Sequence, residues 1–313
     1  MQRNNHLKKA RILSWDRHGK QITFYLPGMF HYYGRRGEYP AISITGSDCA
    51  LQCDHCMATT LQPMIPALTP DKLIEKALSL AEKGAHGILI SGGCDLEGRL
   101  PWAHFIPAIR QIKEQTDLFI SVHCGILDYG TARNLKDAGI DQALIDVIGD
   151  DETYRKIYHV DFGISRILHS MFSLKRAGIP IIPHVVCGLY YGKMRSEKKA
   201  LEYISTFDVD MVVIVSLMTI PGTPLWGIQS PQAEEVADII AEARIMMPDA
   251  KIGLGCARQR GDIPMEILAI DAGVNRMALP SKEALTHAAD YQLELRFQKT
   301  CCSVSRDLSK KNW

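Results

Sequence analysis

The stretch Ile42–Met57, ISITGSDCALQCDHCM, is the part of this sequence that decides the fold and the site. Its cysteines, Cys49, Cys53 and Cys56, form a C-x3-C-x2-C motif that follows a short apolar strand, Ala41–Ile44, and a Thr-Gly turn. Three thiols within eight residues converge on one point, which is typical of a soft metal or an iron–sulfur cluster. Three ligands to a four-iron cluster leave one iron free for a non-protein ligand.

Two more ordinary explanations of the three cysteines are weaker. Structural zinc sites usually pair two C-x2-C units around a tetrahedron, and this chain has no second unit. Structural disulfides are not expected, because the nine cysteines occur in an enzyme-sized chain that starts without a secretion signal. We therefore expect the motif to bind an iron–sulfur cluster.

The composition predicts a cytoplasmic enzyme. The chain has 313 residues, of which 46% are hydrophobic, enough for one large domain with short extensions. The net charge of +1 predicts no nucleic-acid partner and no attraction to a membrane surface. The longest apolar stretch, Met211–Ile220, is too short to cross a bilayer.

From residue 40 to about residue 290, apolar runs of strand length alternate with helical patterns. Alternating short strands and helices favour a parallel sheet, and eight such units favour a closed α/β barrel of the (β/α)8 TIM type. A doubly wound open sheet is the competing fold, but no G-x-G-x-x-G turn follows the first strand. The expected strands are Ala41–Ile44, His86–Ser91, Leu118–His123, Gln142–Val147, Ile179–Val186, Met211–Leu217, Lys251–Leu254 and Val274–Ala278. The expected helices are Thr69–Lys83, Pro101–Gln115, Tyr129–Ala138, Ile164–Ala177, Ser196–Thr206, Gln232–Met247 and Ile263–Ala272.

Three parts of the chain follow from this pattern. Residues 1–39 form an N-terminal extension with a strand at Gln21–Leu26, residues 40–291 form the barrel, and residues 292–313 form a C-terminal tail. A charged tail is frayed by default. The adjacent pair Cys301 and Cys302 argues against that default here.

Further cysteines gather at one end of the predicted barrel, where the chemistry of this fold takes place. Single cysteines follow four of the strands: Cys94, Cys124, Cys187 and Cys256. A lone cysteine is more often a small buried hydrophobe than a ligand. Because all four fall at the carboxyl ends of strands, we expect a subset of them, together with Cys301 or Cys302, to bind a second iron–sulfur cluster.

The C-x3-C-x2-C motif after the first barrel strand resembles that of the radical S-adenosylmethionine (SAM) enzymes. This resemblance implies that Cys49, Cys53 and Cys56 hold a [4Fe–4S] cluster and that the open iron binds the amino and carboxylate groups of SAM. It also implies reductive cleavage of SAM to a 5′-deoxyadenosyl radical that abstracts hydrogen from an unactivated carbon. The family often has an aromatic residue before the third cysteine, and His55 occupies that position here.

The resemblance also assigns residues to SAM. Gly92 and Gly93 match the first two residues of a Gly-Gly-Glu segment whose backbone meets the SAM amino group, whereas Cys94 replaces the glutamate. A tight turn between strand and helix is the alternative role of these glycines. Asp146 after the fourth strand and the backbone at Ile220–Thr223 complete the expected SAM-positioning set.

Within the superfamily, residues 40–290 look like the biotin-synthase-like branch, through the segments GTPL, DETY and AR after strands six, four and seven. Arg258 matches the arginine that binds the second cluster of biotin synthase, and it is expected to contact the cluster, SAM or substrate, or else to form a buried salt bridge. Cys124 and Cys187 lie several residues beyond the corresponding biotin synthase ligands, and Asp146 replaces an asparagine-rich motif. Biotin formation itself is therefore not favoured.

The segments Gly255–Gly261 (GCAR-x-RG) and Thr300–Val304 (TCCSV) are similar to the smaller second subunit of the archaeal-type two-component lipoyl synthase. This similarity implies that sulfur from a sacrificial auxiliary iron–sulfur cluster is inserted at C6 or C8 of an octanoyl chain. The implied partners are an octanoylated lipoyl-carrier protein (H protein or E2 domain), a homologous synthase subunit, and an electron donor such as ferredoxin or flavodoxin. The alternatives are biotin synthase or a hydrogenase-cofactor maturase, a non-catalytic iron–sulfur protein, and a zinc-dependent hydrolase.

Overall fold

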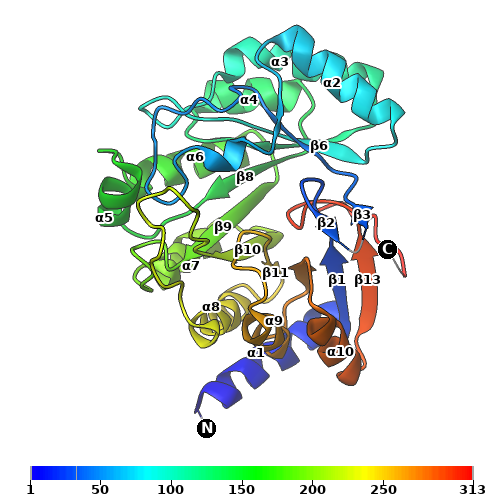
Figure 1. Cartoon of the computed structure of the whole chain (residues 1–313), viewed down its shortest axis with the longest axis vertical. Helices are drawn as coiled ribbons and strands as arrows, with labels where there is room; N and C mark the ends of the chain where they lie inside the picture. Colours follow the sequence, from blue (N-terminus) through cyan, green and yellow to red (C-terminus); the bar gives the residue numbers. More distant parts are fainter. Residues whose placement is uncertain (1, 33, 312–313) are drawn as a thin grey trace.

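The computed structural model describes residues 2–32 and 34–311, which form one curved sheet of eleven parallel strands with helices along its outer face (Figure 1). Positions 1, 33, 312 and 313 of the predicted extensions lie outside the described residues. In sheet order the strands are β13 (Glu294–Gln298), β1 (Gln21–Tyr25), β12 (Arg276–Ala278), β11 (Lys251–Leu254), β10 (Met211–Ser216), β9 (Ile181–Cys187), β8 (Gln142–Asp146), β7 (Phe119–His123), β6 (Gly87–Ser91), β4 (Ala41–Ser43) and β5 (Ile65–Pro66).

The eight expected barrel strands are confirmed as β4 and β6 to β12, so the α/β barrel-type fold is confirmed. The sheet differs from a closed ring in one respect. Strand β12 pairs with β1, and β1 pairs in turn with β13, so that β12 does not return to β4. The result is an open half-barrel whose described edges are β13 and β5. A strand from each predicted extension thus becomes part of the sheet.

The expected helices are also confirmed, each within one or two residues of its predicted ends. The hydroxyl of Thr69 caps the first of them by accepting from the amide of Lys72 at 3.3 Å, with Pro70 in the first turn. These helices are α2 (Pro70–Glu82), α3 (Trp102–Gln115), α4 (Tyr129–Asp137), α6 (Ile164–Arg176), α7 (Glu197–Ser205), α8 (Ala233–Met246) and α9 (Ile263–Asp271). Elements that we did not expect are the strands β5 and β13, α1 (Gln2–His18), α10 (Lys282–Asp290), the short α5 (Asp151–Thr153), the π-helix η2 (Tyr154–Tyr158), the 3-10 turn η1 (Thr59–Leu61) and the antiparallel pair β2 (His31–Tyr32) and β3 (Arg35–Arg36).

The two faces of the sheet carry two different apolar clusters, because successive side chains of a strand point to opposite faces. The outer cluster packs the strands against the helices and includes Ile88, Ile120 and Val185. The inner cluster lies inside the curve of the sheet and includes Leu144 and Ile182. Its other buried members are Tyr25, Met211, Val213, Val215, Ala278 and Cys302. No helix among the described residues is long and apolar enough to cross a membrane.

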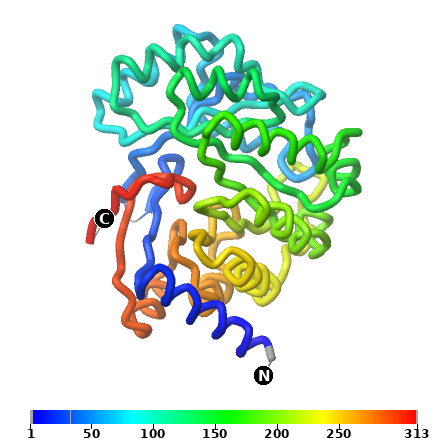
Figure 2. Tube along the Cα trace, turned by 180° about the vertical axis from the view of Figure 1, so that it is seen from behind, coloured from blue at the N-terminus to red at the C-terminus, as the bar shows by residue number. Residues whose placement is uncertain are grey.

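The C-terminal tail is ordered by contacts inside the sheet rather than frayed. After β13 it returns toward the N-terminal segment, as the red and blue parts of Figure 2 show, and the carbonyl of Lys299 accepts from the amide of Glu38 at 2.6 Å. The side chain of Gln142 then donates to the carbonyl of Ser303 at 2.8 Å and accepts from the amide of Ser305 at 3.0 Å. Tail residues therefore lie between β13 and the start of β4, and Val304 is fully buried. This segment therefore lies inside the half-barrel, against residues of β8 and β12.

Replacing Arg276 with Met is expected to loosen this tail. The Arg276 side chain is 4% exposed and donates to the backbone carbonyls of Cys302 and Val304, which would lose their charged partner. We expect a loss of about 2 kcal/mol in the free energy of unfolding, measured by urea denaturation. The matched control is Arg296→Met on β13, whose ion pairs with Glu294 and Asp307 are exposed to solvent and contribute little. Equal stabilities of the two variants would contradict this role of the tail.

Candidate active site

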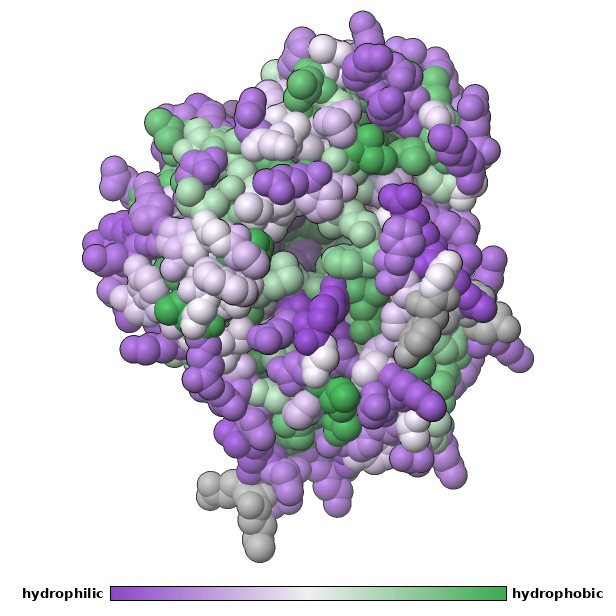
Figure 3. Space-filling view, in the orientation of Figure 1, coloured by the Kyte–Doolittle hydropathy of each residue, from purple (hydrophilic) through white to green (hydrophobic). Residues whose placement is uncertain are grey.

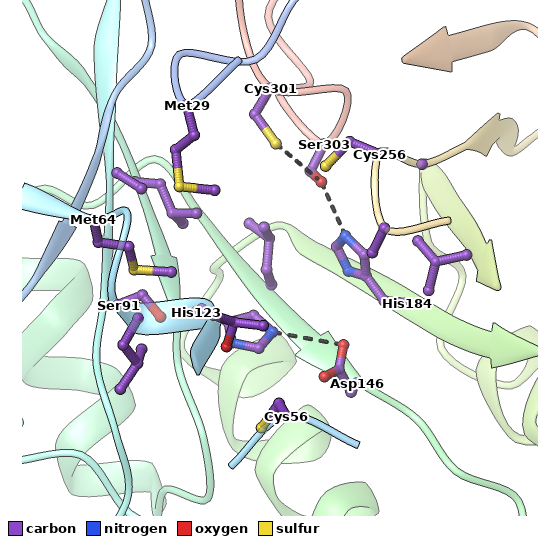
Figure 4. A pocket seen from close by; sticks show the side chains of 18 of the residues that line it. Met29, Cys56, Met64, Ser91, His123, Asp146, His184, Cys256, Cys301 and Ser303 are labelled. Carbon is purple, nitrogen blue, oxygen red and sulfur yellow. Dashed lines mark hydrogen bonds and ion pairs between the residues drawn. The ribbon is translucent and has the colours of Figure 1, made fainter. Parts of the chain in front are cut away.

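A cavity of about 330 Å³ lies inside the curve of the sheet. It opens near the centre of the face shown in Figure 3, where the surface is hollowed. Its walls come from the carboxyl ends of the strands, from the loop after β4 and from the C-terminal tail. Figure 4 shows Cys56 at one end of this cavity and Cys256 and Cys301 at the other. The cavity therefore has sulfur at both ends.

The first group of thiols, Cys49, Cys53 and Cys56, lies on the loop after β4. This loop is tightly wound: the amide of Cys56 donates to the carbonyl of Cys53 at 3.0 Å, and Gln52 and Met57 have φ angles of 45° and 43°. Hydrogen bonds from Cys53 and then from His55 lower the pKa of Cys56, although burial opposes the shift. Cys56 therefore ionises readily, and a thiolate is the form that binds iron.

The end of β6 packs directly against this loop. The amide of Gly93 donates to the hydroxyl of Thr45 at 2.6 Å, and the amide of Cys94 donates to the sulfur of Cys49 at 3.4 Å. A Cβ atom on Gly93 would lie 1.9 Å from the carbonyl oxygen of Asp48 and 2.5 Å from the Cβ of Cys49. The glycine is thus required for the close approach of β6 to the cysteine loop. An amide that donates to a cysteine sulfur is also suited to an iron–sulfur site.

His55 takes the place of an aromatic residue in this loop. Its ring packs against that of Tyr158, with a centroid separation of 5.2 Å. Burial alone would lower the pKa of His55, but the hydrogen bond with Cys56 and the charge of that thiol outweigh burial and raise it. Among the described residues, the buried Nδ1 atom of His55 has no hydrogen-bond partner.

The second group of thiols, Cys256, Cys301 and Cys302, joins the loop after β11 to the tail. Cys302 lies between the other two thiols and interacts with both Cys256 and Cys301. The hydrogen bond from Cys302 lowers the pKa of Cys256, whereas donation to Cys256 raises the pKa of Cys302 to about 12. These three sulfurs come from two segments more than forty residues apart in the sequence, and the tail alone brings them together.

A row of polar side chains lies between the two thiol groups (Figure 4). Nε2 of His123 lies 3.6 Å from Oδ1 of Asp146, and Nε2 of His184 lies 2.9 Å from the hydroxyl of Ser303, which is 3.6 Å from the sulfur of Cys301. Burial would raise the pKa of Asp146, but the charge and hydrogen bond of His123 outweigh it and lower the pKa to about 2. Burial lowers the pKa of His184 to about 4. At neutral pH Asp146 is therefore ionised and His184 is neutral.

Two predicted ligands, Cys124 and Cys187, do not reach the cavity. Both side chains are fully buried in the outer cluster, between the sheet and the helices. On the same strands His123 and His184 face inward, so alternation along each strand turns the two cysteines outward. Cys94 lines the cavity, but it lies beside Cys49 and not with the second thiol group.

Arg258 is also turned away from the cavity. Its side chain is 1% exposed and forms a 2.7 Å salt bridge with Glu266. The same guanidinium donates to the carbonyls of Gly255 at 2.6 Å and Ala278 at 2.7 Å. The structure therefore matches the second of the two predicted roles of Arg258, a buried salt bridge beneath the barrel rim.

Several residues that line the cavity escaped prediction. His123 and His184 are inward-facing strand residues, and alternation along the strands was a signal that could have identified them. Ser303 stood in the sequence beside the cysteine pair but was not singled out. Met29 and Met64 reach the cavity from loops that carry no comparable signal (Figure 4).

Among residues 2–32 and 34–311, no group of three His, Cys, Asp or Glu side chains has the geometry to hold a single metal ion. The protein ligands of an iron–sulfur cluster are distributed over its several irons, so they do not all bind the same ion. Thiols that line one end of a cavity therefore suit a cluster without converging on one ion. The first thiol group fits such a cluster, because its loop lines one end of the cavity. Gly93 packs closely against this loop, and the amide of Cys94 donates to the sulfur of Cys49.

Comparison with known proteins identifies the class. Residues 43–206 match the family described as the radical SAM superfamily, and the chain belongs to that superfamily. Residues 214–312 match the biotin and thiamin synthesis associated domain. With biotin synthases among its relatives, the chain belongs to the biotin-synthase-like branch. Enzymes of this class use a [4Fe–4S] cluster together with SAM, as the cysteine motif predicts.

The relatives differ in the reactions that their names state. A biotin synthase of Pelotomaculum thermopropionicum is 25% identical over 256 residues, which cover 79% of this chain and 78% of the relative. A 3-methylornithine synthase of Methanosarcina barkeri is 25% identical over 269 residues, which cover 85% and 76%. The family resemblance therefore leaves the substrate open.

Two solved structures share the fold. The structure of a methylornithine synthase aligns with a TM-score of 0.64 and 20% identity over 98% of this chain and 83% of its own. The [FeFe]-hydrogenase maturase HydG aligns with a TM-score of 0.66 and 16% identity over 94% of this chain and 68% of its own. Both support the half-barrel described above.

Gly93→Ala is expected to displace the cysteine loop, because the added Cβ would collide with Asp48 and Cys49. Since misplacing reacting groups by about 1 Å can cost roughly 100-fold in rate, SAM cleavage to 5′-deoxyadenosine should fall by at least that factor. The measurement is product formation after anaerobic reconstitution and reduction. Gly130→Ala in α4 is the control, since its Cβ would meet only a side-chain oxygen 3.5 Å away. Normal SAM cleavage by Gly93→Ala would show that the contact is dispensable.

Proposed function

We propose that this protein is a radical SAM sulfurtransferase of the lipoyl synthase type, a subunit that inserts sulfur into a protein-bound octanoyl chain. One observation supports the proposal above others: two groups of thiols line opposite ends of a single cavity. One group suits the SAM cluster, and the other suits an auxiliary cluster that serves as a source of sulfur.

The wall between the two thiol groups suits an aliphatic chain. Leu89, Leu144, Val213 and Val215 line it from three different strands, β6, β8 and β10. Apolar cavities with a few polar groups bind ligands of matching shape and polarity. A saturated carbon of such a chain would lie between the two ends, within reach of both.

In the proposed mechanism Cys49, Cys53 and Cys56 hold the [4Fe–4S] cluster. When bound and reduced, this cluster would supply the electron for the cleavage of SAM to a 5′-deoxyadenosyl radical, the species that abstracts hydrogen in this class of enzyme. Gly92 and Gly93 bring the backbone of β6 against the cysteine loop, which leaves room for SAM beside it. The ionised Asp146, which faces the cavity, is suited to orient SAM by accepting a hydrogen bond from its amino group.

Cys256, Cys301 and Cys302 are the proposed ligands of the auxiliary cluster, which when bound supplies sulfur to the substrate carbon. The tail that carries two of them is buried between β13 and β4, so it also closes the floor of the cavity. Exclusion of water and oxygen protects both a carbon radical and exposed clusters. The tail therefore has two proposed roles, to supply thiolates and to seal the cavity.

The proposed partners follow from the substrate. An octanoyl chain on a lysine of an H protein or E2 domain would enter through the surface hollow, with the carrier outside (Figure 3). A homologous subunit would insert the second sulfur, and ferredoxin or flavodoxin in the cytoplasm would supply electrons. Each of these assignments rests on the similarity of the GCAR-x-RG and TCCSV segments to the lipoyl synthase subunit.

Biotin synthase is the second candidate, because several relatives carry that name at 25–29% identity. Two features of the chain favour lipoyl over biotin synthesis. Arg258, the counterpart of the cluster-binding arginine, forms a salt bridge with Glu266 outside the cavity. Cys124 and Cys187 face the helices rather than the cavity.

Iron content separates two clusters from one. In a Cys49/Cys53/Cys56→Ala variant the second thiol group is unchanged, so after anaerobic reconstitution we expect roughly one third to one half of the wild-type iron and sulfide, for a second cluster of two or four irons. A Cys256/Cys301/Cys302→Ala variant should retain the complementary share and still cleave SAM. Complete loss of iron in the first variant would refute the auxiliary cluster.

Sulfur insertion is expected to depend on Cys302 and not on Cys187, although both side chains are almost completely buried. With an octanoyl-lysine peptide and the homologous partner subunit, Cys302→Ala should lose lipoyl product while 5′-deoxyadenosine is still formed. Cys187→Ala, the matched control from the outer cluster, should keep both. Mass spectrometry of the peptide measures the product, with dethiobiotin as the competing substrate. Conversion of dethiobiotin, with no thiolated peptide, would favour biotin synthase instead.

A further inference from the structure

His184 on β9 is the one histidine whose side chain faces the second thiol group (Figure 4) within the part of the chain that the structure describes. Its Nδ1 atom lies 3.1 Å from the backbone carbonyl of Ile182, and a carbonyl can only accept. Nδ1 therefore carries the proton in the neutral ring. The lone pair on Nε2 is left to face the cavity.

The partner of Nε2 is a hydroxyl next to the cysteine pair. Ser303 lies 2.9 Å from Nε2 and 3.6 Å from the sulfur of Cys301. Because Nδ1 carries the ring proton, Nε2 can only accept, and the hydroxyl of Ser303 therefore donates to it. The Nε2 lone pair is thus separated from the thiol group by a single oxygen atom.

This arrangement is that of a metal-binding histidine. A ligating imidazole commonly donates its other ring nitrogen to a backbone carbonyl, which fixes the tautomer and the ring orientation. Three cysteines supply three of the four protein ligands that an iron–sulfur cluster usually has, and histidine replaces cysteine in some clusters. Of the other two histidines that line the cavity, His123 faces Asp146 and His55 lies beside Cys56 in the first thiol group.

We propose that Nε2 of His184 is the nitrogen ligand of the auxiliary cluster, together with the thiolates of Cys256, Cys301 and Cys302. The Nε2 lone pair exchanges its hydrogen bond from Ser303 for a bond to iron, and the proton stays on Nδ1, bonded to Ile182. A neutral nitrogen donor makes the cluster less negative than a fourth thiolate would, which raises its reduction potential. The inference rests on the proposed function, since it needs a second cluster at these cysteines.

Pulsed electron paramagnetic resonance of the reduced auxiliary cluster tests this ligand. The Cys49/Cys53/Cys56→Ala protein is the background, because it removes the signal of the SAM cluster. We expect a strong nitrogen coupling that changes on labelling with [15N]histidine. His184→Cys should keep the cluster, with a sulfur in place of nitrogen, and lose the coupling. His123→Gln is the matched control and should keep the coupling, because its ring faces Asp146.

His184→Ala with added imidazole gives a second measurement. Removal of the ring should lower iron retention at the second site, and imidazole should restore both the iron and the nitrogen coupling. A cluster that forms in the background protein without a histidine coupling would overturn the ligand while leaving the auxiliary cluster in place. The absence of any cluster in that background would overturn the auxiliary cluster as well. Circular dichroism verifies that each variant is folded.

Discussion

The position of the C-terminal tail inside the half-barrel is the constraint on which the site depends. The tail crosses the inner face of the sheet, where Gln142 of β8 and Arg276 of β12 hold its backbone. These two side chains are the first residues of β8 and β12, so the tail is anchored near the amino ends of the strands. The space above the tail, toward the carboxyl ends, becomes the cavity.

The tail also explains why sulfur occurs at both ends of one cavity. A local loop after β4 provides the first thiol group, so the spacing of its cysteines is a property of the sequence alone. The second group forms only when Cys301 and Cys302 meet Cys256 from another part of the chain. The first site is therefore intrinsic to the superfamily motif, whereas the second depends on the folding of the whole domain. In the proposed function, the first site generates the radical and the second site donates sulfur.

The strands, the helices and the first thiol group could be predicted from the sequence, because each depends on local patterns. Apolar runs, Thr69-Pro70 and the cysteine spacing act within a few residues. The open ring could not be predicted, because the pairing of β1 with both β12 and β13 joins the two ends of the chain. The positions of Cys124 and Cys187 were predictable in principle. Successive side chains of a strand point to opposite faces, so a cysteine an odd number of residues from the inward-facing His123 or His184 points outward. Arg258 could not be placed, because its partner Glu266 lies on the following helix and no local pattern links them.

The location of iron in an anaerobically reconstituted crystal, found by anomalous scattering at the iron edge, tests the central claim most directly. The account predicts two separate iron sites at the two ends of the cavity, one beside Cys49, Cys53 and Cys56 and the other beside Cys256, Cys301 and Cys302. Iron at the first site alone, or a second site behind the sheet at Cys124 or Cys187, would contradict it.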